Sequence, residues 1–326
     1  MYRLIFLIFI VSVFASLHQN EFYTNQFGVY INQFGKKYEK TEYNYRLEVF
    51  RNALDFIENE NRKNHTYMLG FSPFLDMTRE EFKSSKISSC LLTKNRPSLR
   101  KTVKLDTSNI PSSVNWVTRG AVNKVKNQQN CGSCWAFSAV GSIESVVAIH
   151  TGILYSISEQ NLIDCDPNNH GCSGGTMENA FLFAINRPGL CTESAYPYEA
   201  ISGTCRDAYC RKVGFIGDYA EVEENNGEQL LAAIALNPVS LALEADSYVF
   251  QYYVSGIINE ESCGTFINHG VVAVGYETDK VSTIPYILIR NCWGSSWGME
   301  GYVKIAHQDK GEGICGMNTR ASYPIY

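Results

Sequence analysis

The most informative stretch of the sequence runs from Gln128 to Phe137 and reads QQNCGSCWAF. The residues that follow, Ala139 to Ile149, contain no proline and have a helical composition, so Cys134 is expected where a helix begins. Free N–H groups and the positive end of the dipole at a helix N-terminus favour a thiolate over a thiol. The stretch therefore predicts a reactive cysteine at position 134.

A reactive thiol also needs a base, and one histidine of the C-terminal part stands out. His269 directly precedes the apolar residues 270–275, whereas the others lie at a helix end, in a polar loop or among charged residues: His150, His170 and His307. Asn291 follows a second apolar segment, Tyr286–Arg290. Its amide can accept the imidazole N–H and fix the tautomer, while Trp293 can shield that bond from water.

Length and composition describe an ordinary globular protein without nucleic-acid-binding character. The chain has 326 residues, of which 45% are apolar and 19% are charged, and its net charge is −5. Residues 17–109 hold 15 Lys/Arg and 11 Asp/Glu, whereas residues 110–326 hold 12 and 22. Net charges of +4 and −10 on two parts of one chain suggest that one part binds the other.

The N-terminus has the pattern of a signal peptide. Arg3 precedes an apolar run from Leu4 to Phe14, which is too short to span a membrane, and Ala15 and Ser16 close it. We therefore expect a signal peptide over residues 1–16 and entry into the secretory pathway. Eleven cysteines, ten of them after residue 130, fit that oxidising compartment, and their odd number requires at least one free thiol.

The rest of the chain divides into two parts. Glu21 to Glu81 has helical periodicity, with a second helix expected from Thr41 to Asn61. Residues 94–109 are rich in Lys, Arg, Ser and Thr, which is typical of an exposed, cleavable linker. Short strands, glycines and aromatic residues follow. We therefore predict a helical segment over 17–109 and a separate domain over 110–326.

These features together resemble the papain family of cysteine peptidases, in particular its cathepsin L-like members. Cys-Gly-Ser-Cys-Trp matches the nucleophile motif, and His269 and Asn291 follow Cys134 by 135 and 157 residues. Gln128 matches the family's oxyanion-hole glutamine. The resemblance implies an α+β, two-lobed fold with a helical lobe, a β-barrel-like lobe and the active site in the cleft between them.

The resemblance also implies the role of each site residue. Cys134 attacks the scissile carbonyl as part of a thiolate–imidazolium pair with His269, and Asn291 orients the imidazole. Gln128 stabilises the oxyanion, and the reaction needs no metal or organic cofactor. Contacts with the substrate are implied for Gly174, Gly175, Thr176, Met177, Ala242, Asn268, Gly270, Trp293 and Arg320.

Five of these residues match the pocket for the second substrate residue before the cut: Thr176, Met177, Ala242, Gly270 and Arg320. Arg320 matches the floor of that pocket. Its guanidinium either accepts an acidic or polar substrate side chain or turns out to solvent and leaves a plain apolar pocket.

The family pattern implies three disulfides, which leave Cys134 free: Cys131–Cys172, Cys165–Cys205 and Cys263–Cys315. Cys191 and Cys210 form a fourth bridge or remain as buried thiols, or pair in another way. Cys292 stands where the family usually has serine. It is either a small buried residue or an oxidation-sensitive thiol near the site.

The N-terminal segment resembles the family's inhibitory propeptide. Five residues have the spacing of its helical motif: Glu42, Arg46, Phe50, Ile57 and Asn61. Residues 70–76 resemble the motif that follows, and Ala53 and Ser72 replace expected asparagines. The implied partners are protein and peptide substrates, the propeptide itself and cystatin-like inhibitors, for a monomer in a lysosome-like vesicle or outside the cell.

Other interpretations compete with a peptidase. Cys131 and Cys134 form a C-x-x-C motif, as in a redox dithiol or half a zinc site, but the sequence has no second such motif. A catalytically inactive binding protein would typically have lost a catalytic residue, and an adhesion module would not explain the strand after His269. Endopeptidase activity is favoured because the spacings from Cys134 to Cys172 and on to Cys205, 38 and 33 residues, leave no room for an insert that blocks the cleft.

Overall fold

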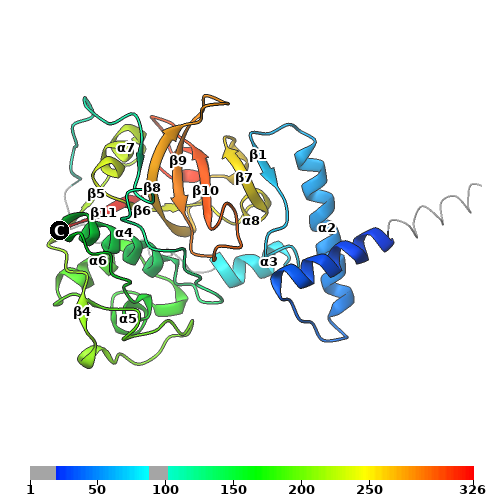
Figure 1. Ribbon diagram of the computed structural model, residues 1–326, viewed down its shortest axis with the longest axis horizontal. Helices are drawn as coiled ribbons and strands as arrows, with labels where there is room; N and C mark the ends of the chain where they lie inside the picture. The colour runs from blue at the N-terminus through cyan, green and yellow to red at the C-terminus, as the bar shows by residue number, and fades with distance from the viewer. Residues whose placement is uncertain (1–19, 88–101) are drawn as a thin grey trace, which may run out of the picture.

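The computed structural model describes residues 20–87 and 102–326. The expected signal peptide and half of the expected linker, residues 94–101, lie outside these residues. Two crossing helices, residues 20–34 and α2 (Tyr43–Asn61), occupy one end of the molecule (Figure 1). The main sheet lies in the middle, and α4 (Cys134–Thr151) with its neighbouring helices lies at the other end.

Aromatic packing joins the two N-terminal helices. Phe27 and Tyr30 lie one turn apart on the first helix, and their rings contact Phe50 of α2 at centroid distances of 5.2 and 5.0 Å. Arg46 of α2 connects the two helices to residues 76–81, because it donates to the side chain of Glu81 and to the backbone oxygen of Asp76. These contacts explain the motif spacing, because the motif residues face a shared core.

The expected helical character up to Glu81 is wrong beyond Asn61. Residues 62–78 instead form turns and the strand β1 (Tyr67–Leu69). The Asn61 side chain exchanges two hydrogen bonds with the backbone of Leu69, at 2.9 and 3.0 Å, and so fixes the chain reversal. The backbone of β1 pairs with β7 (Tyr253–Ile258), which supplies the hydrogen bonds that a helix would otherwise make internally.

One sheet connects the N-terminal segment to the rest of the chain. Its strand order is β1-β7-β10-β9-β8-β6-β11-β5, with β2 (Val114–Asn115) paired to β8. The other strands are β5 (Asp218–Glu221), β6 (Val239–Leu243), β8 (His269–Thr278), β9 (Pro285–Arg290), β10 (Tyr302–Ala306) and β11 (Ala321–Ile325). The N-terminal segment thus adds an antiparallel strand to an edge of this sheet.

Helix α4 packs against β8 and is buried along most of its length. The buried serines of α4 satisfy their hydroxyl groups by hydrogen bonds inside the protein. Ser138 Oγ, for example, donates to the backbone oxygen of Val271 at 2.6 Å. Gly141 permits the close approach, because a Cβ there would lie 3.0 Å from the side chain of Val272. The helix that begins at Cys134 is therefore held rigidly against the strand that begins at His269.

Shorter elements complete the structure. The helices are α3 (Arg79–Phe82), α5 (Glu159–Cys165), α6 (Met177–Ile185), α7 (Gly227–Leu236) and α8 (Tyr248–Gln251), and a second small sheet pairs β3 (Leu190–Cys191) with β4 (Lys212–Val213). The single-turn elements are η1 (Lys83–Ile87), η2 (Gly171–Ser173), η3 (Asp207–Tyr209), η4 (Glu261–Cys263) and η5 (Ile314–Gly316).

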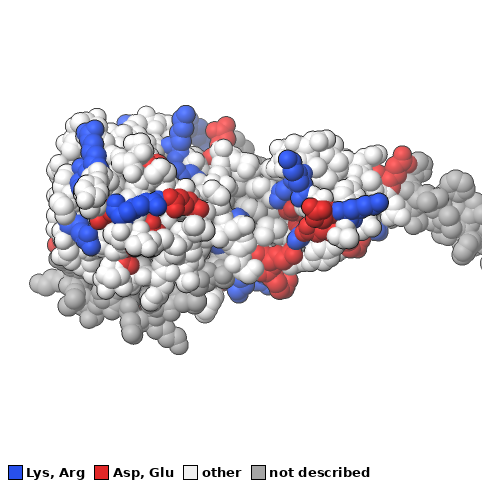
Figure 2. All heavy atoms as spheres, turned by 90° about the horizontal axis from the view of Figure 1, so that it is seen from below, with Lys and Arg blue, Asp and Glu red and all other residues white. Residues whose placement is uncertain are grey.

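The predicted α+β class is confirmed. Over the described residues the strand pairings form an open path that ends at β1 and β5 and does not close into a barrel. No helix of this part of the chain has both the length and the apolar character needed to cross a membrane. On the face shown in Figure 2, acidic and basic side chains are interspersed over both ends of the molecule.

Candidate active site

Cys134 is the first residue of α4 and is fully buried. Its sulfur accepts a hydrogen bond from the backbone N–H of Gly270 at 3.1 Å. The expectation that Cys134 is the free thiol is wrong for this structure, in which Cys134 is disulfide-bonded and Cys292 is the free cysteine of the described residues. Nucleophilic chemistry at Cys134 therefore begins from the reduced site.

His269 opens β8, and its Nε2–H donates to Asn291 Oδ1 at 2.8 Å. Burial lowers the pKa of His269 to about 4, although the hydrogen bond to Asn291 opposes the shift. The imidazole is therefore neutral at physiological pH in this structure. Its Nδ1 has no hydrogen-bond partner in the described part of the chain, and this nitrogen is left to take up a proton.

Asn291 directly follows β9 and is oriented by two contacts. Its Oδ1 accepts the backbone N–H of Cys292 at 2.8 Å in addition to the imidazole N–H, so the amide cannot turn over without losing both bonds. The ring of Trp293 lies 4.7 Å from that of His269, centroid to centroid. The imidazole is thus held between an amide and an indole, and water is kept from the His269–Asn291 bond.

Gln128 is fully buried and contacts the two residues that follow Asn291. Its Oε1 accepts two hydrogen bonds, from Trp293 Nε1 at 3.0 Å and from the Cys292 thiol at 2.9 Å. Its Nε2 donates to the backbone oxygens of Cys131 at 2.8 Å and of Lys86 at 3.2 Å. The side-chain amide therefore presents its N–H groups to a carbonyl oxygen, as an oxyanion donor must.

One of the two carbonyl oxygens that Gln128 Nε2 binds, that of Lys86, belongs to the N-terminal segment. Lys86 also donates from Nζ to the backbone oxygen of Gln129 at 2.8 Å, and Ile87 beside it is buried. Phe82 packs edge-to-face on Trp293 at 5.2 Å. The N-terminal segment thus covers the site and places its own peptide group at the amide of Gln128.

The remaining predicted substrate residues lie close to this centre. Ala242 and Gly270 are paired across β6 and β8, and Met177 lies beside Gly270, since a Cβ there would be 3.4 Å from the methionine sulfur. Gly175 is in close contact with the ring of Trp135 and cannot carry a side chain without displacing it. Gly174 and Thr176 flank Gly175, and Thr176 caps α6.

Asn268, next to His269, has its side chain bonded to the loop that follows β6. Its Oδ1 accepts the backbone N–H of Ala245 at 2.9 Å. The contact fixes the loop that follows β6 against the start of β8. Asn268 therefore supports the position of His269 from the backbone side.

Both expectations for Arg320 are corrected. The guanidinium neither turns out to solvent nor remains available for an acidic ligand, because Nε and Nη2 donate to the two oxygens of Glu178 at 3.1 and 2.7 Å. Both side chains are buried, with 6% and 3% exposed. The charge of Arg320 is therefore neutralised inside the protein by a residue that sequence reasoning did not select, although Glu178 directly follows Met177.

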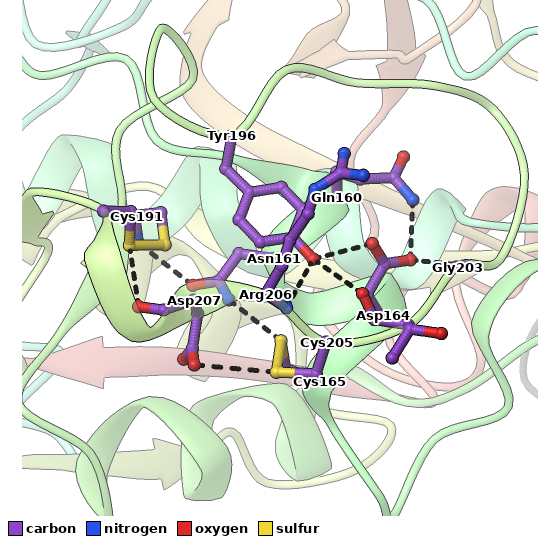
Figure 3. Close-up of a disulfide and its surroundings, with 12 residues drawn as sticks. Gln160, Asn161, Asp164, Cys165, Cys191, Tyr196, Gly203, Cys205, Arg206 and Asp207 are labelled. Atoms are coloured by element: carbon purple, nitrogen blue, oxygen red, sulfur yellow. Dashed lines mark hydrogen bonds between the residues drawn. A yellow bond between two sulfur atoms is a disulfide. The ribbon is translucent and has the colours of Figure 1, made fainter.

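Four disulfides join the described cysteines: Cys131–Cys172, Cys165–Cys205, Cys191–Cys210 and Cys263–Cys315. Figure 3 shows two of them, on either side of Asp207. Asp164, in the same view, accepts from Tyr196 Oη at 2.8 Å and from the Gly203 N–H at 2.7 Å. This arrangement fixes the loop between β3 and β4. Of these four bridges, Cys131–Cys172 includes the residue three positions before Cys134.

Sequence reasoning also missed Tyr198. Its hydroxyl donates to the backbone oxygen of Gln128 at 2.6 Å and lies 2.9 Å from Ser133 Oγ. Tyr198 therefore links Gln128 to Ser133, the residue directly before Cys134. Burial raises the pKa of Tyr198, so the phenol stays a donor at physiological pH. No local motif surrounds Tyr198, and only its position in the fold reveals this contact.

Comparison with known proteins places this geometry in context. Residues 110–325 match the model of the papain family of cysteine proteases, and residues 27–82 match that of the cathepsin propeptide inhibitor domain. The chain is 42% identical to the cysteine proteinase RD21A of Arabidopsis thaliana over 285 residues, which are 86% of this chain. The match spans 61% of that relative's length.

Solved precursors have the same architecture. The recombinant stem bromelain precursor superposes with a TM-score of 0.86 at 35% identity, over 93% of this chain and 98% of the other. The digestive procathepsin L2 proteinase from the larval midgut of Tenebrio molitor gives a TM-score of 0.86 at 32% identity, over 93% and 100%. Both similarities include the N-terminal segment, since they cover more of the chain than residues 110–326.

Proposed function

The chain belongs to the papain family of cysteine proteases, and on this premise we propose that it is a cysteine endopeptidase made as an inactive precursor. The observation that carries the proposal is the convergence of four side chains: Cys134 at the start of α4, His269 bonded to Asn291 at 2.8 Å, and Gln128 with its N–H groups on a peptide carbonyl. An inactive binding protein has no support, because all four residues are present and His269 is hydrogen-bonded to Asn291.

The reaction starts with reduced Cys134 and no prosegment in the cleft. His269 Nδ1 takes the thiol proton, and the thiolate at the helix N-terminus attacks the scissile carbon. The carbonyl oxygen becomes an oxyanion, stabilised by Gln128 Nε2 and the Cys134 backbone N–H. His269 returns the proton to the leaving amine, and water then hydrolyses the thioester. Removal of one oxyanion donor costs about 3–4 kcal/mol of transition-state stabilisation in serine enzymes.

The pKa of His269 separates the precursor from the mature enzyme. Burial under the prosegment and the absence of a thiolate keep the imidazole neutral, with a pKa of about 4. Exposure of the cleft and formation of the thiolate each favour the protonated imidazole. We therefore propose that the thiolate–imidazolium pair forms only after the prosegment leaves.

Residues 17–109 are proposed to act as an inhibitory propeptide, with 110–326 as the mature peptidase. The occupation of the Gln128 amide by the Lys86 carbonyl supports this, as does the match of residues 27–82 to a propeptide inhibitor domain. The signal-peptide pattern and the disulfides support the secretory pathway, with a lysosome-like vesicle or the extracellular space as destination. We further propose a monomer that cystatin-like inhibitors can block.

The substrate pocket is proposed to be neutral and apolar. Thr176, Met177, Ala242 and Gly270 supply its walls, and the buried pair of Arg320 with Glu178 lies behind them. A fully paired guanidinium offers no free donor to an acidic side chain and repels a basic one only weakly. A leucine-like residue at the second position before the cut should therefore be preferred over arginine and over glutamate.

A labelling experiment tests the catalytic proposal. The precursor is processed at acid pH with a thiol reductant and treated with a peptidyl epoxide, and peptide mapping should then locate the adduct on Cys134. Cys134→Ser should neither label nor hydrolyse a peptide substrate, because an uncharged hydroxyl does not replace a thiolate. Hydrolysis by Cys134→Ser above background would refute the assignment.

A peptide library tests the pocket. Wild type should prefer leucine at the second position before the cut, and Glu178→Gln should raise the relative rate for glutamate, because the arginine loses its counter-charge. Arg320→Ala is the control and should not gain that preference. A wild-type preference for arginine or glutamate would refute a neutral pocket.

A further inference from the structure

The free thiol of Cys292 contacts the oxyanion donor rather than the nucleophile. Its sulfur lies 2.9 Å from Gln128 Oε1 and 3.9 Å from His269 Nε2. The Nε2–H of His269 donates to Asn291 and not to this sulfur. Burial raises the pKa of the Cys292 thiol, so the sulfur keeps its proton and can donate it. Cys292 and Trp293 are therefore the two donors to the same oxygen of Gln128.

The backbone of Gln128 is fixed independently of its side chain. Its N–H donates to the backbone oxygen of Cys292 at 2.8 Å, and its carbonyl accepts from Tyr198 Oη at 2.6 Å. The remaining freedom is a turn of the terminal amide, which exchanges oxygen and nitrogen within almost the same volume. The turned amide would present an oxygen to the oxyanion position and repel it.

We propose that Cys292 is a positioning residue whose S–H holds the Gln128 amide with its N–H groups directed at the oxyanion position. The inference rests on the proposed peptidase function and adds a determinant of the oxyanion hole to it. Trp293 supplies the second donor to Gln128 Oε1, so removal of the thiol weakens the orientation without abolishing it. A hydroxyl at the same position keeps the donor, whereas a methyl group does not.

The test compares mature, reduced Cys292→Ala and Cys292→Ser with wild type, each normalised by titration with a peptidyl epoxide. Cys292→Ala should lower kcat by about tenfold with KM unchanged, less than the 10²–10³-fold of a lost oxyanion donor. Cys292→Ser should retain kcat within about threefold of wild type, because its O–H replaces the S–H donor. The affinity for a peptide aldehyde, whose adduct places an oxygen at the same position, should fall with kcat.

A double-mutant cycle separates this role from a structural one. In a Gln128→Ala background, the further change Cys292→Ala should alter kcat by less than twofold, because the amide it orients is gone. The pH profile of kcat/KM should not move in Cys292→Ala, since the His269–Asn291 bond is untouched. Cys292→Val, which fills the volume of the thiol without a donor, replaces alanine if that variant does not fold.

Three results would overturn the proposal: full activity in Cys292→Ala, failure of Cys292→Ser to restore kcat, or an undiminished loss in the Gln128→Ala background. Any of these can occur while wild type still labels at Cys134 and hydrolyses peptides. Failure of the positioning role is therefore distinguishable from failure of the proposed function, which would appear in wild type itself.

Discussion

The two parts of the chain are stabilised by different means. The domain from residue 110 onwards contains four disulfides, three of which close loops of 40 to 52 residues. The described residues of the N-terminal segment, 20–87, are instead held by aromatic packing, one strand pairing and ion pairs. Covalent links survive acid, whereas ion pairs do not. We therefore expect acid to weaken the contacts of residues 20–87 more than it weakens the fold of the domain from residue 110 onwards.

The contact between the parts combines three kinds of interaction. Strand β1 pairs with β7, Phe82 and Phe74 pack on Trp293 beside the site, and Lys83 with Arg79 contacts Asp246. The aromatic contact is insensitive to pH and supplies buried area, while the ion pairs respond to acid. Each kind can be removed separately, which allows the comparison to be tested.

The largest effect is expected from Phe82→Ala. Phe82 is fully buried between Phe74 and Trp293, and loss of a buried phenylalanine costs about 3–5 kcal/mol. The fraction of precursor with an open cleft should rise by about 10²- to 10³-fold. The measurement is the initial rate of processing at pH 7 under reducing conditions.

Phe22→Ala is the matched control, because Phe22 belongs to the same segment and is 53% exposed. Its processing rate should stay within about twofold of wild type. Equal rates for Phe82→Ala and wild type would show that the aromatic contact does not hold the segment in place.

A smaller effect is expected when Cys191 and Cys210 are both changed to alanine. This change should affect the stability of the domain from residue 110 onwards and not the docking of the N-terminal segment. The bridge closes a segment of 19 residues, and its removal should lower the free energy of unfolding of the mature domain by about 3 kcal/mol. Denaturation in guanidinium chloride after epoxide labelling measures the change. The processing rate of the precursor at pH 7 should remain that of wild type.

Phe82→Ala serves as the reciprocal control, since it should leave the stability of the mature domain unchanged. If loss of the Cys191–Cys210 bridge accelerated processing as strongly as Phe82→Ala, the two parts would not be stabilised independently.

Local sequence patterns predicted the secondary structure around the site better than that of residues 62–78 in the N-terminal segment. The α+β class followed from resemblance, and the helix after Cys134 and the strands after His269 and before Asn291 followed from unbroken apolar runs. The helical periodicity of residues 62–78 gave a wrong prediction of secondary structure. Strand β1 forms there because its backbone pairs with β7, almost 200 residues away in sequence. Periodicity within one segment carries no information about such a partner.

The site was predicted unevenly for the same reason. Cys134, His269, Asn291 and Gln128 belong to short motifs. In the structure His269 bonds to Asn291, Gly270 beside His269 bonds to Cys134, and Gln128 bonds to Trp293. The state of Arg320 depends on Glu178, 142 residues earlier in the chain, and the contact of Cys292 depends on Gln128, 164 residues earlier. Pairings across the fold decide these roles, and neither residue's own neighbours indicate them.

The smallest expected effect concerns the acid-sensitive contact. Lys83 Nζ lies 2.9 Å from Asp246, whose side chain is buried. Burial opposes ionisation of this carboxyl, but the hydrogen bond and charge of Lys83, with the charge of Arg79, outweigh it and lower the pKa of Asp246. A lowered pKa means that the ion pair stabilises docking above the free carboxyl value of about 4 and ceases to do so as the pH falls through the lowered value.

Lys83→Ala should therefore accelerate processing about two- to fivefold at pH 7, because a partly exposed pair contributes about 0.5–1 kcal/mol. The ratio of mutant to wild-type rates should begin to fall below about pH 4 and should approach one only as the pH falls through the lowered pKa of Asp246, where protonation removes the pair. Using the ratio cancels the pH dependence of the peptidase itself. Lys40→Ala removes the same charge from an exposed lysine without an ion pair in the described chain, and it should give a ratio near one at every pH. A Lys83→Ala ratio that did not decline as the pH was lowered from 7 through the lowered pKa of Asp246, or that Lys40→Ala reproduced, would show that net charge rather than this contact controls release.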